Sequence, residues 1–148
     1  MKKIVALCIA IILLMCSGCS FKVKKNTFSI PTENVSVVTF QKRCVDETGK
    51  NYYIEKNVTE KKDIKTICEK VQTTPMKRAD TTVPQPIDDV DFVIIIKSGI
   101  KYHIILNEKK AFYDQVAYEY VSKKTYNEYS SLYNSLNYEE KTTEVDLY

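Results

Sequence analysis

The chain of 148 residues contains no tryptophan, three glycines and a single histidine. One of the glycines, Gly18, falls in the apolar start of the chain, so the remainder cannot supply a glycine-rich phosphate loop or the GxSxG turn of α/β-hydrolases. His103 stands alone, and the segment Asp88-Asp89-Val90-Asp91 lacks the alternating ligands and turn glycine of a calcium loop. We therefore expect no metal, no cofactor and no nucleotide chemistry.

The only long apolar run occupies residues 4–16, directly after Lys2 and Lys3. A positive start followed by an apolar run of this length is typical of a secretory signal peptide. A membrane-spanning helix needs about 20 apolar residues, and this run stops short at Ser17 and Gly18. We expect residues 1–18 to be a cleaved targeting segment.

The segment Leu14-Met15-Cys16-Ser17-Gly18-Cys19-Ser20 resembles the lipobox of bacterial prolipoproteins, in which small residues occupy the two positions before a cysteine. Ser17 and Gly18 match, whereas Cys16 stands where the family prefers leucine, and ordinary secretory cleavage nearby is the alternative. The resemblance implies cleavage between Gly18 and Cys19, and a diacylglyceryl thioether on the Cys19 sulfur. It also implies a cell-membrane location on the outer, extracytoplasmic face.

Two acyl chains suffice for stable anchoring in a bilayer, whereas one chain binds only marginally. Residues 19–28 would then form a membrane-proximal tether, in which Lys22, Lys24 and Lys25 either contact anionic headgroups or are simply solvated. The predicted partner at this end of the chain is the lipid bilayer, reached through Cys19.

The mature chain is expected to form one domain, residues 29–138, with a polar, frayed tail at residues 139–148. Loss of Lys2 and Lys3 leaves 20 basic and 19 acidic side chains, and no basic stripe predicts a nucleic-acid partner. Nine of the eleven tyrosines lie at or after Tyr102. They are interpreted as half-buried positions, with a glycan- or peptide-binding face as the alternative.

Alternation predicts a strand at residues 35–44, with Val38, Phe40 and Cys44 on one face, followed by a return strand at residues 52–55. A helix is predicted from an N-cap at Thr59 to about Thr73. Its apolar stripe consists of Ile64, Ile67, Cys68 and Val71.

Residues 74–89 carry three prolines and are predicted to be a loop that is either functional or a plain spacer. Three strands should follow. The first, residues 90–97, is apolar on both faces and is expected to be central. A turn at Ser98 and Gly99 leads to residues 100–106, where His103 should face away from Tyr102, and then to residues 111–113.

Ser122 is predicted to cap a last helix that carries a stripe of tyrosine and leucine side chains. The order ββα, loop, βββ, α predicts an α+β domain with a mainly antiparallel sheet and two helices packed on it. Signal, length and layout are similar to small lipoproteins of low-GC Gram-positive bacteria. That resemblance carries over no site residue beyond Cys19.

Cys44 and Cys68 remain after processing and lipidation, and either form a disulfide or stay as buried free thiols. A bond closing a loop of about 25 residues would contribute about 3.5 kcal/mol in the chain-entropy model. Free buried cysteines behave as small hydrophobic residues.

The leading functional hypothesis is a noncatalytic binding or interaction module of the cell envelope, with an envelope protein or wall glycan as partner. Its contact surface would be the loop at residues 74–89 or the tyrosine-bearing C-terminal region. The alternatives are an immunity or inhibitor lipoprotein, and an envelope hydrolase with spatially assembled carboxylates.

Overall fold

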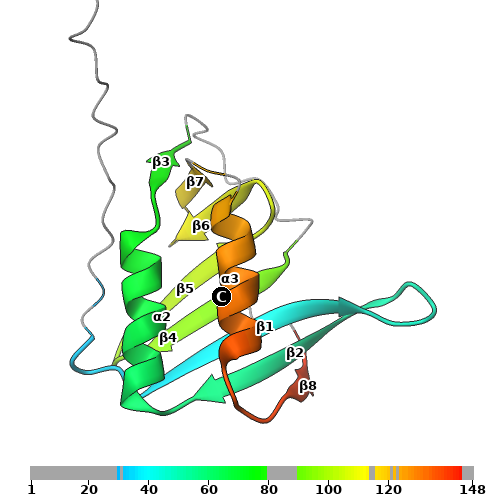
Figure 1. Cartoon of the computed structure of the whole chain (residues 1–148), viewed down its shortest axis with the longest axis horizontal. Helices are drawn as coiled ribbons and strands as arrows, with labels where there is room; N and C mark the ends of the chain where they lie inside the picture. The colour runs from blue at the N-terminus through cyan, green and yellow to red at the C-terminus, as the bar shows by residue number, and fades with distance from the viewer. Residues whose placement is uncertain are drawn as a thin grey trace, which may run out of the picture.

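The structure, a computed structural model, describes residues 30, 32–79, 90–113, 116–120, 122 and 124–144. These residues form an eight-stranded antiparallel sheet with two helices, which confirms the predicted α+β class (Figure 1). The elements are β1 Val37–Val45, β2 Asn51–Val58, α2 Lys61–Thr73, β3 Met76–Arg78, β4 Phe92–Lys97, β5 Lys101–Leu106, β6 Lys110–Tyr113, β7 Val116–Tyr120, α3 Lys124–Ser135 and β8 Lys141–Thr143. Neither helix of this part of the chain is long and apolar enough to cross a membrane.

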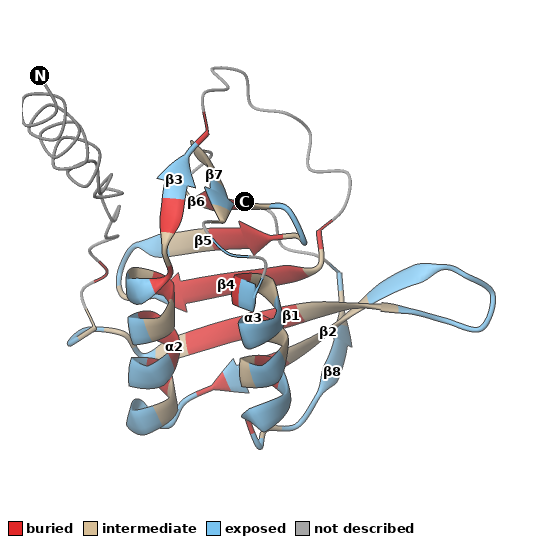
Figure 2. Cartoon of the chain, turned by 45° about the horizontal axis from the view of Figure 1, so that its top comes forward, coloured by how far each residue is buried: buried red, intermediate tan, exposed pale blue. Residues whose placement is uncertain are grey.

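The strands lie in the order β3-β7-β6-β5-β4-β1-β2-β8, so the predicted central strand, β4, lies between β5 and β1. Its side chains are buried on both faces of the sheet, as its unbroken apolar sequence predicts. Ile94 and Ile96 join the larger core beneath the helices, whereas Val93 and Ile95 belong to a second cluster on the opposite face. Figure 2 shows this buried band across the middle of the sheet.

Helix α2 buries the predicted stripe against the sheet, but the predicted N-cap at Thr59 is wrong. Glu60 holds the N-cap position and makes no side-chain capping hydrogen bond. Instead, the hydroxyl of Tyr138 accepts a hydrogen bond from the Glu60 backbone N–H at 3.2 Å and donates one to the Asp63 carboxylate at 2.9 Å. A residue distant in sequence therefore contacts the first turn of α2, while the Glu60 carbonyl accepts from the backbone N–H groups of Asp63 and Ile64.

Helix α3 begins as predicted, because the Ser122 hydroxyl oxygen accepts a hydrogen bond from the Lys124 backbone N–H at 3.3 Å. Thr125, Tyr129 and Tyr133 follow at four-residue intervals and are buried. Phe40 of β1 meets the Tyr133 ring edge to face, with ring centres 5.1 Å apart. The aromatic stripe thus packs α3 onto the centre of the sheet.

Strands β3, β7 and β8 were not predicted from the sequence. Strand β3 lies inside the predicted loop and pairs with β7, while residues 80–89 of that loop lie outside the described residues. Strand β8 pairs with β2, so the expectation of a frayed tail is wrong for residues 141–143. Strands β3 and β8 have three residues each, which is too few alternating positions to stand out in a sequence.

The C-terminal end of α3 is closed by Lys56 of β2, whose side chain is only 7% exposed. Its ammonium donates hydrogen bonds to the backbone carbonyls of Tyr133 at 3.0 Å and Leu136 at 2.8 Å. It also lies 4.5 Å from the centre of the Tyr133 ring and 3.5 Å from the Glu140 carboxylate. The cation therefore satisfies carbonyls that the helix leaves without intrahelical partners, at the negative end of its dipole.

Lys56→Met keeps the apolar stem and removes the ammonium, which leaves two buried carbonyls without a donor. We expect a loss of about 2 to 4 kcal/mol in the free energy of unfolding, measured by urea titration. The matched control is Lys42→Met, because Lys42 contacts the same helix through an exposed hydrogen bond to Asn134 and should cost below about 1 kcal/mol. Equal costs for both substitutions would contradict the capping role.

Candidate functional site

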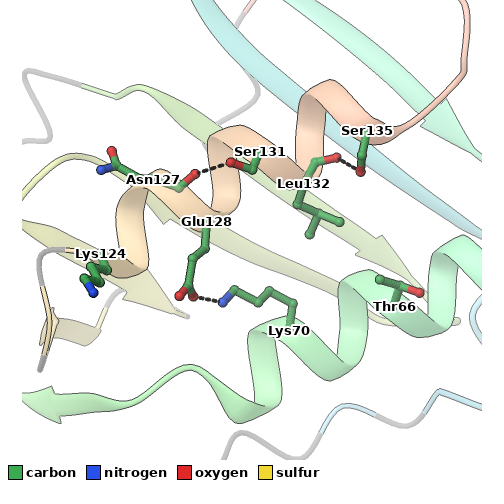
Figure 3. A pocket seen from close by; sticks show the side chains of 8 residues that line it. All are labelled: Thr66, Lys70, Lys124, Asn127, Glu128, Ser131, Leu132 and Ser135. Atoms are coloured by element: carbon green, nitrogen blue, oxygen red, sulfur yellow. Dashed lines mark hydrogen bonds and ion pairs between the residues drawn. The ribbon is translucent and has the colours of Figure 1, made fainter.

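The interhelical groove, a depression of about 620 Å³ between α2 and α3, is the candidate functional site (Figure 3). Two of its residues come from α2 and six from α3. They are Thr66, Lys70, Lys124, Asn127, Glu128, Ser131, Leu132 and Ser135. Apart from half-buried Leu132, every one of these side chains has a polar group, but carbon atoms make up most of the surface that the groove exposes, so it offers hydrogen-bonding groups on a largely aliphatic floor.

The two helices are tied together near one end of the groove. The Lys70 ammonium forms an ion pair with the Glu128 carboxylate across it. Beneath this pair, the Tyr129 hydroxyl bonds to the Thr74 hydroxyl at 2.8 Å, and Thr74 donates to the Lys70 carbonyl at 2.6 Å. The Tyr138 contact with Asp63 ties the first turn of α2 to the segment that follows α3. The width of the groove is therefore set by contacts at both ends.

The hydroxyl groups of the groove are oriented by their own helices. Thr66 donates to the Lys62 carbonyl at 2.9 Å, Ser131 to Asn127 at 3.0 Å, and Ser135 to Leu132 at 2.7 Å. A hydroxyl that donates its only proton still has acceptor lone pairs. The groove thus offers acceptors to a ligand's N–H or O–H groups, and Lys124 adds a cationic donor at one end.

The tyrosines of the C-terminal half do not form an exposed face in the described residues. Tyr129 and Tyr133 are fully buried, and the other six from Tyr102 to Tyr138 pack against the larger core, which confirms the half-buried interpretation. Burial raises the pKa of both Tyr129 and Tyr133 far above the ordinary value. Burial and the nearby Asp91 carboxylate raise the pKa of Tyr126 to about 12. These phenols stay neutral and are structural.

The thiols and the histidine are not brought together. Cys68 is buried on the inner side of α2, whereas His103 pairs with Ile95 on the opposite face of the sheet, away from Tyr102 as predicted. The His103 Nδ1 atom is buried without a hydrogen-bond partner. The sheet therefore separates the imidazole from the Cys68 thiol.

Of the two alternatives for Cys44 and Cys68, the structure has the free thiols. Cys44 lies near the β1–β2 hairpin, and α3 lies between that hairpin and α2 (Figure 1). Burial, with a smaller contribution from the Glu69 charge, raises the pKa of the Cys68 thiol to about 11. Half-buried Cys44 is the more accessible of the two.

The acidic residues before β4 contribute an ion pair rather than a ligand set. Asp91 binds the Arg43 guanidinium and accepts a hydrogen bond from the Arg43 backbone N–H through its carbonyl at 2.8 Å. This agrees with a polar approach to a buried strand, and the described residues contain no group of three metal-ligating side chains. Asp88 and Asp89 lie outside the described residues, as do Gly18 and Cys19.

The residues of the groove were not predicted from the sequence. The polar sides of both helices are evident from their periodicity, but nothing in the sequence places Lys70 opposite Glu128. Comparison of the chain with protein-family models, curated proteins and solved structures gives no match. The groove therefore has to be interpreted from its own chemistry.

The two thiols should differ in reactivity, because the thiolate is the reactive form and needs access to solvent. At pH 8 we expect iodoacetamide to alkylate Cys44 in the folded protein and to reach Cys68 only after denaturation. Peptide mass mapping measures both sites, with Cys44→Ser as the control. A native mass lower by two hydrogens, with neither cysteine alkylated, would show a disulfide and contradict the assignment of Cys44 and Cys68 as free thiols.

Proposed function

We propose that the chain is a lipoprotein attached through Cys19 to the outer face of the cell membrane, and that its domain is a noncatalytic binding module of the envelope. Its ligand is an extended polar segment of an envelope protein, bound in the interhelical groove. The groove between the two tied helices is the observation that carries this proposal.

The attachment is supported by the start of the chain. Lys2 and Lys3 precede an apolar run of signal-peptide length, and Ser17 and Gly18 precede the cysteine as a lipobox requires. The domain's first described residue, Ile30, follows Cys19 by eleven positions. An extended chain of that length reaches at most about 40 Å, so the domain would remain close to the bilayer.

The ligand class is supported by the dimensions of the groove and by the hydrogen-bonding groups along its largely aliphatic walls. Twelve residues of α3 extend about 18 Å, which matches about five residues of an extended peptide. A peptide backbone offers N–H donors to the oxygens of Thr66, Ser131 and Ser135, and carbonyl acceptors to Lys124. None of the lining residues is aromatic, so the groove lacks the flat apolar surface on which a sugar ring would stack.

The directions of the hydrogen bonds made by the groove hydroxyls support a binding role rather than catalysis. The Ser131 and Ser135 protons are directed to carbonyls of α3, not to a general base. His103 lies on the face of the sheet that the helices do not cover. Glu128, the carboxylate in the groove, is paired with Lys70.

Cys19→Ala should abolish lipid attachment. In growing cells supplied with labelled palmitate, we expect the wild-type chain to incorporate the label and the Cys19→Ala chain to incorporate none. Cys16→Ala is the matched control and should be labelled like the wild type, because its sulfur is not the lipidated one. Label on the Cys19→Ala chain would contradict the assignment.

A photo-reactive benzoylphenylalanine in place of Ser131 should capture the ligand in intact cells. The matched control replaces Asn134, which is exposed on the same helix but contacts Lys42 on the side away from α2. We expect an adduct from position 131 and little from position 134, with partner peptides identified by mass spectrometry.

The pattern of adducts distinguishes the outcomes. Equal adducts from both positions would mean that the groove is not the binding site. If a wall-cleaving muramidase shortens the adduct from position 131, the ligand is wall glycan and not an envelope protein. Loss of a specific adduct in the Cys19→Ala background would show that binding depends on attachment.

A further inference from the structure

The β4–β5 turn, residues 97–101, presents an isolated apolar side chain. Ile100 is 67% exposed, more than any other large hydrophobic residue in the described part of the chain. The turn is tight, because the Ser98 backbone N–H donates to the Ile100 carbonyl at 3.1 Å and Gly99 has a φ of 82°. The turn therefore holds Ile100 out in solvent on a short, well-formed hairpin.

Two exposed lysines flank this side chain. Lys97 and Lys101 are directly opposite each other in the antiparallel pair of β4 and β5, and the turn has no acidic residue. Like charges in directly opposite positions repel and destabilise a strand pair. An anion placed between the two ammonium groups would remove that repulsion.

The turn lies beside the segment through which the chain joins the membrane tether. The Ser36 backbone N–H donates to the Lys97 carbonyl at 3.1 Å, and Val37 pairs with Lys97 at the start of β1. Figure 1 shows this blue segment next to the β4–β5 turn. Upstream, the Gln72 side chain donates to the Ile30 carbonyl at 2.7 Å, which places the start of the described chain on α2.

The opposite end of β1 lies far from this point. Val45 is eight residues beyond Val37, about 26 Å along an extended strand. The β1–β2 hairpin projects from that end of the sheet (Figures 1 and 2). The domain thus has a tether end, with Ile100 between two lysines, and a distal end.

We propose that the β4–β5 turn is a bilayer contact, in which Ile100 inserts at the boundary between headgroups and acyl chains while Lys97 and Lys101 bind the phosphates of anionic lipids. This inference rests on the proposed attachment through Cys19. An apolar residue between cations is the chemistry of interfacial binding, and lysine stems reach past apolar surface to place their charge among headgroups. The adjoining segment carries the acidic Glu33, which would repel anionic lipids. The attraction to their phosphates therefore comes from the two lysines of the turn, Lys97 and Lys101.

The contact would orient the domain as well as hold it close. With the tether end on the lipid, β1 directs the β1–β2 hairpin away from the bilayer. A lipid chain alone would leave the domain free to rotate about its tether.

The absence of tryptophan from the chain permits a direct test. The full-length chain is expressed with its signal, purified from membranes and reconstituted in vesicles of phosphatidylcholine and phosphatidylglycerol, with or without brominated acyl chains. In an Ile100→Trp variant we expect blue-shifted emission that brominated lipid quenches by about twofold or more. Val45→Trp is the matched control, because this exposed valine occupies the distal end, and its emission should be unaffected.

Two further measurements decide between outcomes. Adding Lys97→Glu and Lys101→Glu to the Ile100→Trp variant should reduce quenching, and vesicles of phosphatidylcholine alone should do the same. Flotation of the wild-type chain with vesicles reports attachment separately. If the chain floats and tryptophan at position 100 is as weakly quenched as at position 45, the turn contact is wrong and the attachment stands. If the wild-type chain does not float, both proposals are wrong.

Discussion

A single ammonium group, that of Lys56, closes the C-terminal end of α3 inside the domain. The carbonyls of Tyr133 and Leu136 lie at a buried position, and the Lys56 ammonium, supplied by the sheet, donates a hydrogen bond to each. Because Lys56 belongs to β2, this contact fixes where α3 ends relative to the strands. The Tyr133 ring lies between that cation and Phe40, so charge and apolar packing hold α3 at the same point.

The interhelical groove depends on this placement. Helix α2 is held by its apolar stripe, and α3 by Lys56 and its buried tyrosines, so both walls are fixed to one sheet before any ligand arrives. The Lys70–Glu128 ion pair joins α2 to α3 at the surface. The hydrogen bond between Tyr129 and Thr74 joins α3 to the end of α2 beneath it. Fixing both walls in advance would lower the conformational entropy lost if a ligand bound between them.

The features that sequence analysis predicted are those that local spacing encodes. The two-sided burial of β4 and the buried stripe of α2 each follow from alternation or a helical period within one segment. For β1, alternation predicts which residues share a face, but the expectation that one face alone is buried is wrong, because Thr39 and Gln41 are buried on the other face. The missed features join distant segments: Tyr138 binds Glu60 and Asp63 at the start of α2, and Glu128 meets Lys70. The spacing of residues within one segment carries no information about which distant residues meet. The α+β class was therefore predictable from the sequence, whereas the groove was not.

The outer strands of the described sheet, β3 and β8, have three residues each and carry exposed basic side chains at Lys77, Arg78 and Lys141. A sheet grows from one molecule to the next only where a long, flat edge offers free backbone groups. Here the outermost strand is three residues long at both sides, so it offers few backbone groups with which the strand of a second copy could pair. Many copies crowded on a single surface would remain separate molecules rather than polymerise.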